Sequence, residues 1–266
     1  MLANYKNKFI FIAGPCVIED RKLTFDIASY LKEVFLKYDV CFIFKASFDK
    51  ANRTSIKSGR GVGLKKGIKI LEDIKKKLNI PVLSDIHCRE QIKFVKNILD
   101  VIQIPAFLSR QTDLILEAAK TKKIINIKKA QFMSPYDIKY VIEKIESVGN
   151  KNILITERGT SFGYNNLVVD FRSFLIMKEF GYPVIYDATH SLQRPSALEG
   201  TSGGDRAFIL PLAQAAVACG VDGIFMEVHP KPEEAISDKD TSLPLKDVEI
   251  LVKRVLKIRN SLYEEN

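Results

Sequence analysis

Short runs of apolar and β-branched residues recur along the whole chain, and this pattern constrains the fold more than any other feature. Each run is nearly continuous in its apolar part, which is typical of strands that are buried on both faces of a parallel sheet. Eight such runs are present, at residues 9–16, 41–48, 81–87, 101–107, 124–130, 153–159, 183–190 and 223–230.

Segments with the 3.6-residue period of amphipathic helices separate these runs, and Gly or Pro often marks the return to the next strand. They include residues 23–38, 63–78, 134–147, 165–180, 205–220 and 245–262. The alternation predicts an α/β fold, namely a (β/α)8 TIM barrel, for which this chain length is usual. No linker or composition shift divides the sequence, so we expect a single catalytic domain over residues 1–266. An open doubly wound sheet is the alternative, but no G-x-G-x-x-G sequence follows the first run.

The bulk composition excludes several classes of protein. Apolar residues make up 46% of the chain, yet no run approaches the roughly 18 apolar residues of a membrane span. The first residues lack the layout of a signal peptide, and the four cysteines are far apart without a CxxC pair. We therefore expect a cytoplasmic protein with no disulfide framework and no membrane association.

Positive charge is concentrated in residues 44–61. Five cations there accompany one acid, and like charges this close repel one another unless an anion is bound. The cations are Lys45, Lys50, Arg53, Lys57 and Arg60, and the acid is Asp49. The net charge of +9 could also indicate a nucleic-acid binder. We expect no nucleic-acid partner, because the cations fall at predicted strand ends and the chain has no Trp.

Polar side chains end all eight predicted strands, where a barrel of this kind carries its active site. Lys128 and Arg158 end neighbouring strands, so we expect them to converge on one phosphate or carboxylate. Arg53 and the hydroxyl of Thr54 can clamp a second phosphate from the loop after the second strand. This spacing predicts two anionic groups, or two anionic substrates.

A different set of strand-end residues suits a metal ion. Cys16, His190 and Glu227 end strands one, seven and eight, which become neighbours when the barrel closes, and Asp238 lies in the following loop. A thiolate, an imidazole and two carboxylates suit a divalent transition metal such as Fe²⁺, Zn²⁺, Mn²⁺ or Co²⁺. No local motif connects them, so their spacing leaves open the alternative of a buried cysteine beside a hydrogen-bond network.

Several long motifs, in order from about residue 9 to residue 245, resemble one family of enzymes. They are "IAGPCVIE", "FKASFDKANRTSIKSGRG", "SDIH", "DVIQIPAFLSRQTDL", "NIKKAQFMSP", "TERGTSFGYNNLVVD", "DATHSLQRP", "SGGDRAF" and "MEVHPKPEEAISD". By these motifs the chain is similar to 3-deoxy-D-manno-octulosonate 8-phosphate synthases. Those are homotetrameric barrels that condense phosphoenolpyruvate with D-arabinose 5-phosphate and water. They release inorganic phosphate and make a precursor of lipopolysaccharide.

The resemblance implies a role for each matching position. The catalytic residues would be Lys45, Lys50, Asp85 and His190. The positions that would hold phosphoenolpyruvate are Lys45, Ser47, Lys50, Gln103, Ala106, Lys128, Arg158 and His190. Those that would hold arabinose 5-phosphate are Asn52, Arg53 and Thr54. Arg110 would reach across an interface of the homotetramer to the phosphate end of a neighbour's sugar.

The same resemblance bears on the metal. The family has metal-dependent and metal-independent branches, and the metal-independent branch carries Asn at the position of Cys16. The resemblance therefore implies a divalent metal ion with Cys16, His190, Glu227 and Asp238 as its ligands. Asp240 lies two residues from Asp238 in "SDKDTS" and is an alternative ligand.

Two other enzyme classes use related barrels. 3-Deoxy-D-arabino-heptulosonate 7-phosphate synthase takes erythrose 4-phosphate, and its sugar loop resembles K-P-R-[ST]. Here the loop reads "KANRTS", with Ala51 and Asn52 in place of the proline, which favours the octulosonate enzyme. A Schiff-base aldolase would use Lys45 or Lys128 alone, and borohydride would then trap that lysine covalently with its substrate.

Overall fold

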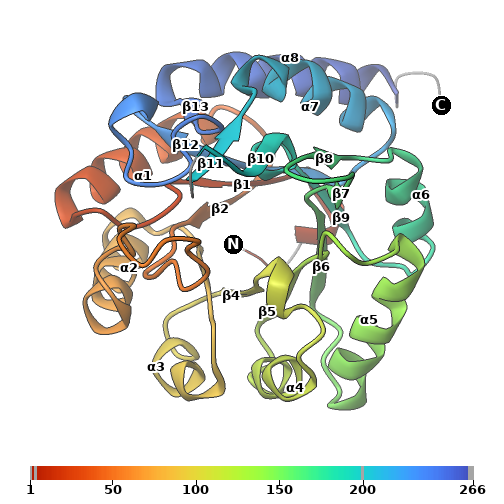
Figure 1. Cartoon of the computed structure of the whole chain (residues 1–266), viewed down its shortest axis with the longest axis horizontal. Coiled ribbons are helices and arrows are strands. Elements are labelled where there is room, and N and C mark those ends of the chain that lie inside the picture. The colour runs from red at the N-terminus through yellow and green to blue at the C-terminus, as the bar shows by residue number, and fades with distance from the viewer. Residues whose placement is uncertain (1, 3–4, 199–200, 263–266) are drawn as a thin grey trace.

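The computed structural model describes residues 2, 5–198 and 201–262. In this part of the chain, eight parallel strands form a closed barrel in the order of the sequence (Figure 1). They are β1 (Ile10–Gly14), β2 (Cys41–Lys45), β3 (Val82–Asp85), β4 (Val101–Ile104), β5 (Ile124–Lys128), β6 (Ile153–Glu157), β9 (Val184–Asp187) and β12 (Gly223–His229). The barrel closes where β12 pairs with β1. The predicted (β/α)8 barrel is confirmed.

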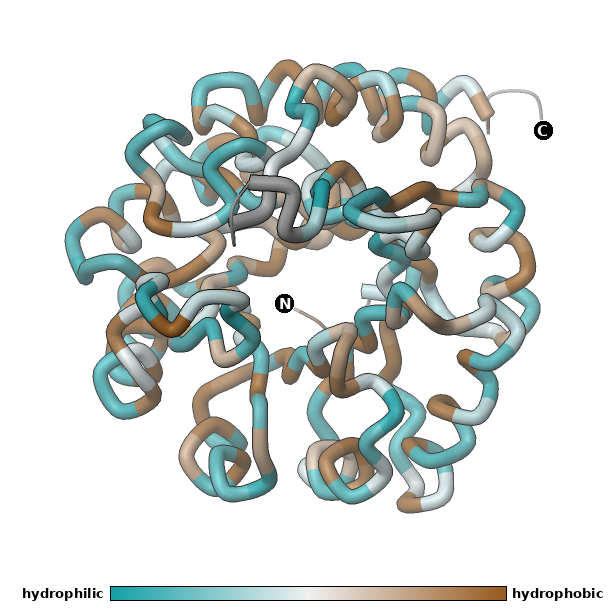
Figure 2. The backbone as a smooth tube through the Cα atoms, in the orientation of Figure 1, coloured by the Kyte–Doolittle hydropathy of each residue, from teal (hydrophilic) through white to brown (hydrophobic). Residues whose placement is uncertain are grey.

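Helices follow the strands and form a ring outside the barrel (Figure 1). They are α1 (Arg21–Phe35), α2 (Leu64–Leu78), α3 (Ile92–Val95), α4 (Thr112–Lys120), α5 (Ile138–Ser147), α6 (Arg172–Lys178), α7 (Ile209–Ala218) and α8 (Val248–Ser261). Figure 2 shows hydrophobic and hydrophilic residues alternating along these helices, as expected when one helix face packs on the barrel. No helix among the described residues is long and apolar enough to cross a membrane.

The helix predicted over residues 165–180 is wrong in its first half. Leu167–Val168 forms β8, which pairs antiparallel with β7 (Thr160–Ser161), and α6 begins only at Arg172. Val168 and Val169 are β-branched, and such residues favour an extended chain over a helix. The carboxylate of Asp170 accepts a hydrogen bond from the backbone N–H of Arg172 and starts the helix there.

The barrel interior explains how the sequence positions polar side chains. Alternate residues of each strand point inward, and the inward positions near the amino ends of the strands form an apolar cluster. It includes Cys41 and Ile43, Leu83, Val101, Ile124, Leu154, Ile185 and Phe225. The next inward position along each of these strands is polar: Lys45, Asp85, Gln103, Asn126, Thr156, Asp187 and Glu227. The same period of two residues therefore builds both the core and the polar carboxyl end of the barrel.

Two smaller elements lie beside that end of the barrel. A hairpin of β10 (Gln193–Leu198) and β11 (Thr201–Gly204) follows β9, and β13 (Leu243–Pro244) pairs with the end of β12. The loop between β12 and β13 carries Asp238, whose φ of 49° lies in the left-handed region. Asp is among the few residue types that adopt this conformation readily. The backbone N–H groups of Thr241 and Ser242 donate to the Asp238 carbonyl and hold the turn.

Candidate active site

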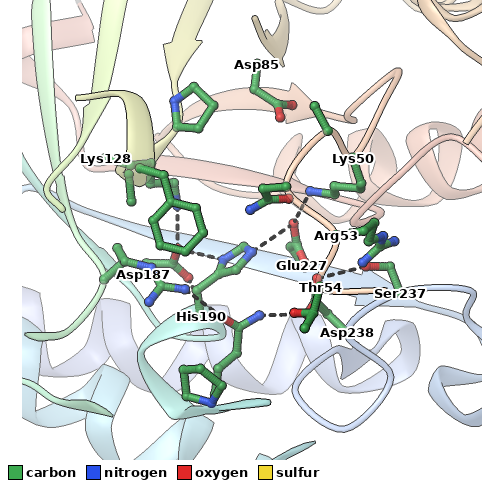
Figure 3. A pocket seen from close by; sticks show the side chains of 18 of the residues that line it. Lys50, Arg53, Thr54, Asp85, Lys128, Asp187, His190, Glu227, Ser237 and Asp238 are labelled. Carbon is green, nitrogen blue, oxygen red and sulfur yellow. Dashed lines mark hydrogen bonds and ion pairs between the residues drawn. The ribbon is translucent and has the colours of Figure 1, made fainter. Parts of the chain in front are cut away.

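A cavity of about 570 Å³ lies at the carboxyl ends of the barrel strands (Figure 3). This volume suits small-molecule substrates. Most of the predicted site residues line it: Lys50, Asn52, Arg53, Thr54, Asp85, Gln103, Ala106, Lys128, Arg158, His190, Glu227 and Asp238. The cations that the sequence placed at separate strand ends therefore converge on one space.

Lys45 lies beside this cavity as a fully buried cation. Its ammonium group donates to Glu227 Oε1 at 2.5 Å and to the carbonyl of Cys16 at 2.7 Å. Lys50 Nζ lies 3.7 Å from the same carboxylate oxygen. Burial alone would raise the pKa of Glu227, but His190 and the two lysines outweigh burial and hold that pKa well below its usual value. Glu227 is therefore an anion that neutralises two cations.

Asp187 orients His190. Its buried carboxylate accepts from His190 Nδ1 at 2.7 Å, from the backbone N–H of His190 at 2.9 Å, and from the ammonium group of Lys128. The other ring nitrogen, Nε2, then faces Glu227 Oε1 at 3.3 Å. Figure 3 shows Lys50, Glu227, His190 and Asp187 joined by these contacts. This arrangement fixes the direction of the imidazole and leaves Nε2 toward the cavity.

Lys128 and Arg158 supply positive charge at a different part of the cavity. Lys128 Nζ lies 3.1 Å from the centre of the Phe225 ring, and burial lowers the pKa of this lysine to about 8 although Asp187 opposes the change. Arg158 is 6% exposed and donates from Nη2 to the side chain of Gln193 at 2.6 Å. Among the described residues, Arg158 Nη1 is buried without a hydrogen-bond partner. A donor in that state is ready for an anionic ligand.

Gln103 is held by a chain of hydrogen bonds across three strands. Thr156 donates to Asn126 at 2.6 Å, and Asn126 donates to the side-chain oxygen of Gln103 at 2.9 Å. Because the oxygen of Gln103 is engaged, its amide N–H groups are the free donors at the cavity. Thr156 and Asn126 thus hold Gln103 so that its neutral amide can donate to a ligand beside the cationic side chains.

Two arginines of the loop after β2 have different surroundings: Arg53 lines the cavity and Arg60 pairs with an acid. Arg53 lines the cavity and donates from Nε to the carbonyl of Gly59 at 2.9 Å, which fixes the guanidinium. Within the described chain, Arg53 Nη2 is buried and has no hydrogen-bond partner. Arg60 instead forms two hydrogen bonds with Asp49, at 2.8 and 2.5 Å. The crowding of positive charge in residues 44–61 is therefore relieved partly by this local pair.

Three of the four predicted metal ligands form a compact group. One ligand atom each from Cys16, Glu227 and Asp238 lies within 4.8 Å of the other two. Cys16 Sγ lies 2.9 Å from Asp238 Oδ2, and Glu227 Oε2 is buried without a hydrogen-bond partner among the described residues. His190 Nε2 adjoins this group through its 3.3 Å contact with Glu227. Burial, then Asp238 and Glu227, raise the pKa of Cys16 well above its usual value.

Comparison with known proteins decides the family. A model of the DAHP synthetase I family matches residues 3–263. A protein of Desulfatibacillum aliphaticivorans is 52% identical over 252 residues, covering 95% of this chain and 92% of the relative. Proteins of Fusobacterium nucleatum and Geobacter sp. strain M21 are 52% and 55% identical, over 95% and 93% of this chain and 91% and 90% of their own lengths. All three are named 2-dehydro-3-deoxyphosphooctonate aldolase, a synonym of the synthase predicted above.

The chain belongs to the 2-dehydro-3-deoxyphosphooctonate aldolase family. Four predicted residues are not part of the cavity lining: Cys16 and Lys45, which contact lining residues as described above, and Ser47 and Arg110. Ser47 is fully buried, and its hydroxyl has no hydrogen-bond partner in the described chain. Arg110 is exposed just before α4, where its carbonyl accepts from Lys144. The contacts predicted for these two residues remain predictions.

Three further residues contact the candidate site of this chain but were not assigned a role from the sequence, although Asp187 was expected at the end of its strand. Asp187 orients His190, Gln193 contacts both Arg158 and Asp238, and Ser237 lies 3.0 Å from Cys16 Sγ. The inward alternation from Ile185 to Asp187 could have revealed the first. Gln193 is the first residue of the hairpin strand β10 and Ser237 lies in the loop after β12, and neither belongs to a barrel strand whose period indicates the direction of a side chain.

Proposed function

We propose that the chain condenses phosphoenolpyruvate with D-arabinose 5-phosphate and water, giving 3-deoxy-D-manno-octulosonate 8-phosphate and inorganic phosphate. The names of its close relatives support this enzyme class. The observation that carries the proposal is the convergence of Lys50, Arg53, Lys128 and Arg158 on one cavity. Two phosphorylated substrates would supply negative charge for these cations, of which Lys128 and Arg158 are buried and Lys50 and Arg53 partly buried.

The two substrates would occupy different parts of the cavity. Phosphoenolpyruvate would lie against Lys128, Arg158 and Gln103, which line the cavity, and Arg158 Nη1 has no hydrogen-bond partner among the described residues and suits a phosphate or a carboxylate. The sugar phosphate would lie at the loop that carries Asn52 and Arg53, since Arg53 has a fixed guanidinium with a free donor. The site would thereby hold carbon 3 of one substrate beside the aldehyde of the other, a positioning contribution to the rate.

In the reaction, carbon 3 of phosphoenolpyruvate attacks the sugar aldehyde while water adds at carbon 2. The resulting hemiketal phosphate loses phosphate when the C–O bond breaks. Negative charge develops at the aldehyde oxygen, and preorganised cations stabilise such charge in a buried site. Lys50 is suited to this role, because its ammonium group lines the cavity. Lys45 would hold Glu227 in place through their 2.5 Å contact.

We also propose a divalent metal ion held by Cys16, His190, Glu227 and Asp238. The residues fit such an ion, because a thiol between two carboxylates needs a cation to become a thiolate, and Glu227 Oε2 lacks a hydrogen-bond partner in the described chain. Asp238 belongs to the compact group, which favours it over Asp240. When bound, the ion would act as a Lewis acid that orients water or polarises the aldehyde.

A homotetramer completes the proposal. Large aromatic side chains more than half exposed lie on the loops and helix around Arg110, and exposed apolar groups of this kind favour association. They are Phe107, Phe132, Tyr136 and Tyr140. Arg110 would then reach a neighbour's sugar phosphate.

Two measurements test the tetramer. Light scattering should report four copies of the 30.1 kDa chain, and Arg110→Ala should weaken sugar-phosphate binding but not phosphoenolpyruvate binding. We place the enzyme in the cytoplasm, where phosphorylated metabolites are available.

The direct test is product identity. Phosphorus NMR of the chain with phosphoenolpyruvate, arabinose 5-phosphate and a divalent metal should show inorganic phosphate and an eight-carbon sugar-acid phosphate appearing in equal amounts. Phosphate release without this sugar acid would mean simple hydrolysis and would contradict the proposal. Covalent trapping of Lys45 or Lys128 by borohydride would instead indicate Schiff-base chemistry.

A further inference from the structure

Gln193 contacts both parts of the candidate active site. Its side-chain oxygen accepts from Arg158 Nη2 at 2.6 Å, and its Nε2 donates to Asp238 Oδ1 at 2.6 Å. A guanidinium only donates and a carboxylate only accepts, so these two contacts fix the direction of the amide. One side chain thus connects a candidate phosphate ligand to a candidate metal ligand.

The hairpin that carries Gln193 is also packed on the turn that carries Asp238. Gln193 lies opposite Gly204 in the pairing of β10 with β11. A Cβ atom at Gly204 would come within 2.0 Å of Thr241 Cγ2, so the two segments are in close contact. Thr241 in turn donates its backbone N–H to the carbonyl of Asp238 at 3.1 Å. This packing contact is independent of the hydrogen bonds of Gln193.

The contact with Gln193 sets how Asp238 presents its carboxylate. Oδ1 accepts from Gln193, and Oδ2 lies 2.9 Å from Cys16 Sγ, on the side of the compact ligand group. Residues that hold a metal ligand in this way typically change metal affinity by about 10- to 100-fold when they are replaced. On the other side, Gln193 holds Nη2 of Arg158, while Nη1 has no partner among the described residues.

We propose that Gln193 is a positioning residue that couples occupancy of the phosphate site at Arg158 to occupancy of the metal site at Asp238. The proposal rests on the proposed function for the identity of the two ligands. A ligand on either side holds the contacts from Arg158 through Gln193 to Asp238 in the arrangement that the structure shows, so the second ligand binds to groups already in place. Because coupling free energies are reciprocal, phosphoenolpyruvate and the metal tighten each other's binding by the same factor.

The test measures this factor without any sugar phosphate. Co²⁺ affinity is determined by competition with a chelator, with and without phosphoenolpyruvate, and phosphoenolpyruvate affinity by calorimetry, with and without Co²⁺. Gln193→Met keeps the length of the side chain but removes both hydrogen bonds. The matched control is Arg194→Met in the same hairpin, which removes an exposed contact with Asp205.

In the wild type and in Arg194→Met, Co²⁺ and phosphoenolpyruvate should each raise the affinity for the other by about fivefold or more. In Gln193→Met the factor should fall to near one, and Co²⁺ affinity should fall about tenfold. Gln193→Glu keeps the oxygen for Arg158 but places an acceptor against Asp238, so Co²⁺ affinity should fall more than phosphoenolpyruvate affinity. Thermal melting checks that each variant folds.

Two results would overturn the proposal: no coupling in the wild type, or the same coupling in the wild type and Gln193→Met. A purely structural role for Gln193 would lower the melting temperature and both affinities but leave the factor unchanged. Failure of the proposed function is seen separately, because the wild type would then form no octulosonate phosphate whatever its binding coupling.

Discussion

Arg158→Lys tests where phosphoenolpyruvate binds. The change keeps one positive charge but replaces a fork of donors by a single ammonium group on a shorter chain. In the structure Arg158 uses Nη2 for Gln193 and has Nη1 free of partners within the described residues. A single lysine ammonium group cannot reach both the side-chain oxygen of Gln193 and a substrate anion at the position of Nη1. The variant should therefore lose about one charge-assisted hydrogen bond to the substrate.

Such a bond contributes about 1.5–3 kcal/mol, and a tenfold change in affinity corresponds to about 1.4 kcal/mol. Phosphoenolpyruvate should therefore bind about 10- to 150-fold more weakly to Arg158→Lys. Isothermal titration calorimetry with phosphoenolpyruvate and with arabinose 5-phosphate measures the two affinities separately. The affinity for arabinose 5-phosphate should stay within about twofold of the wild type, because Arg53 holds that end.

Arg194→Lys is the control, because it makes the same substitution at an exposed arginine of the hairpin that pairs with Asp205. It should leave both affinities unchanged. If Arg158→Lys weakened arabinose 5-phosphate and left phosphoenolpyruvate unaffected, the two substrates would occupy the opposite ends of the cavity. The assignment of Arg158 would then be wrong.

Three further predictions follow from the same contacts. Arg53→Ala should weaken arabinose 5-phosphate binding at least tenfold and spare phosphoenolpyruvate; calorimetry showing the reverse would reject the sugar site. Lys129→Met should lower the free energy of unfolding by about 3 kcal/mol, because it leaves the buried carboxylate of Glu157 without the ammonium group that lies 3.5 Å away. Substrate affinities should stay unchanged, because this ammonium group also donates to the carbonyls of Ala130 and Met133 and Lys129 does not line the cavity. Urea unfolding and calorimetry check both points, and altered substrate binding would argue against a structural role. Dialysis against a chelator should abolish product formation and Zn²⁺ or Mn²⁺ should restore it; a Cys16→Asn variant with full, chelator-resistant activity would show that the metal is dispensable to the chemistry.

The sequence predicted the barrel because two simple periods agree over the whole chain. Buried runs alternate with amphipathic segments, and the inward positions of each strand continue from apolar to polar at its carboxyl end. Lys45, Gln103 and Glu227 could therefore be placed at the mouth of the barrel without coordinates. In residues 165–171 the apolar spacing suggested a helix, but Val168 and Val169 favour an extended chain, and the helical prediction was wrong there.

Long-range contacts were beyond the sequence. Cys16 and Asp238 are 222 residues apart, and no spacing rule brings them within the 2.9 Å that the structure gives. Only the resemblance to a known family linked them. Gln193 was missed for the same reason, since its role depends on Arg158, which follows β6, and on Asp238 in the loop after β12.

The most direct test of the central claim compares the two sugar phosphates. Phosphate release from phosphoenolpyruvate is followed with arabinose 5-phosphate and with erythrose 4-phosphate, each with and without a chelator. The account predicts a strong preference for arabinose 5-phosphate when the metal is present. With the chelator, phosphate release should be lost with both sugar phosphates, because the proposed reaction needs the metal ion. A preference for erythrose 4-phosphate would contradict the account and would make the chain a heptulosonate synthase.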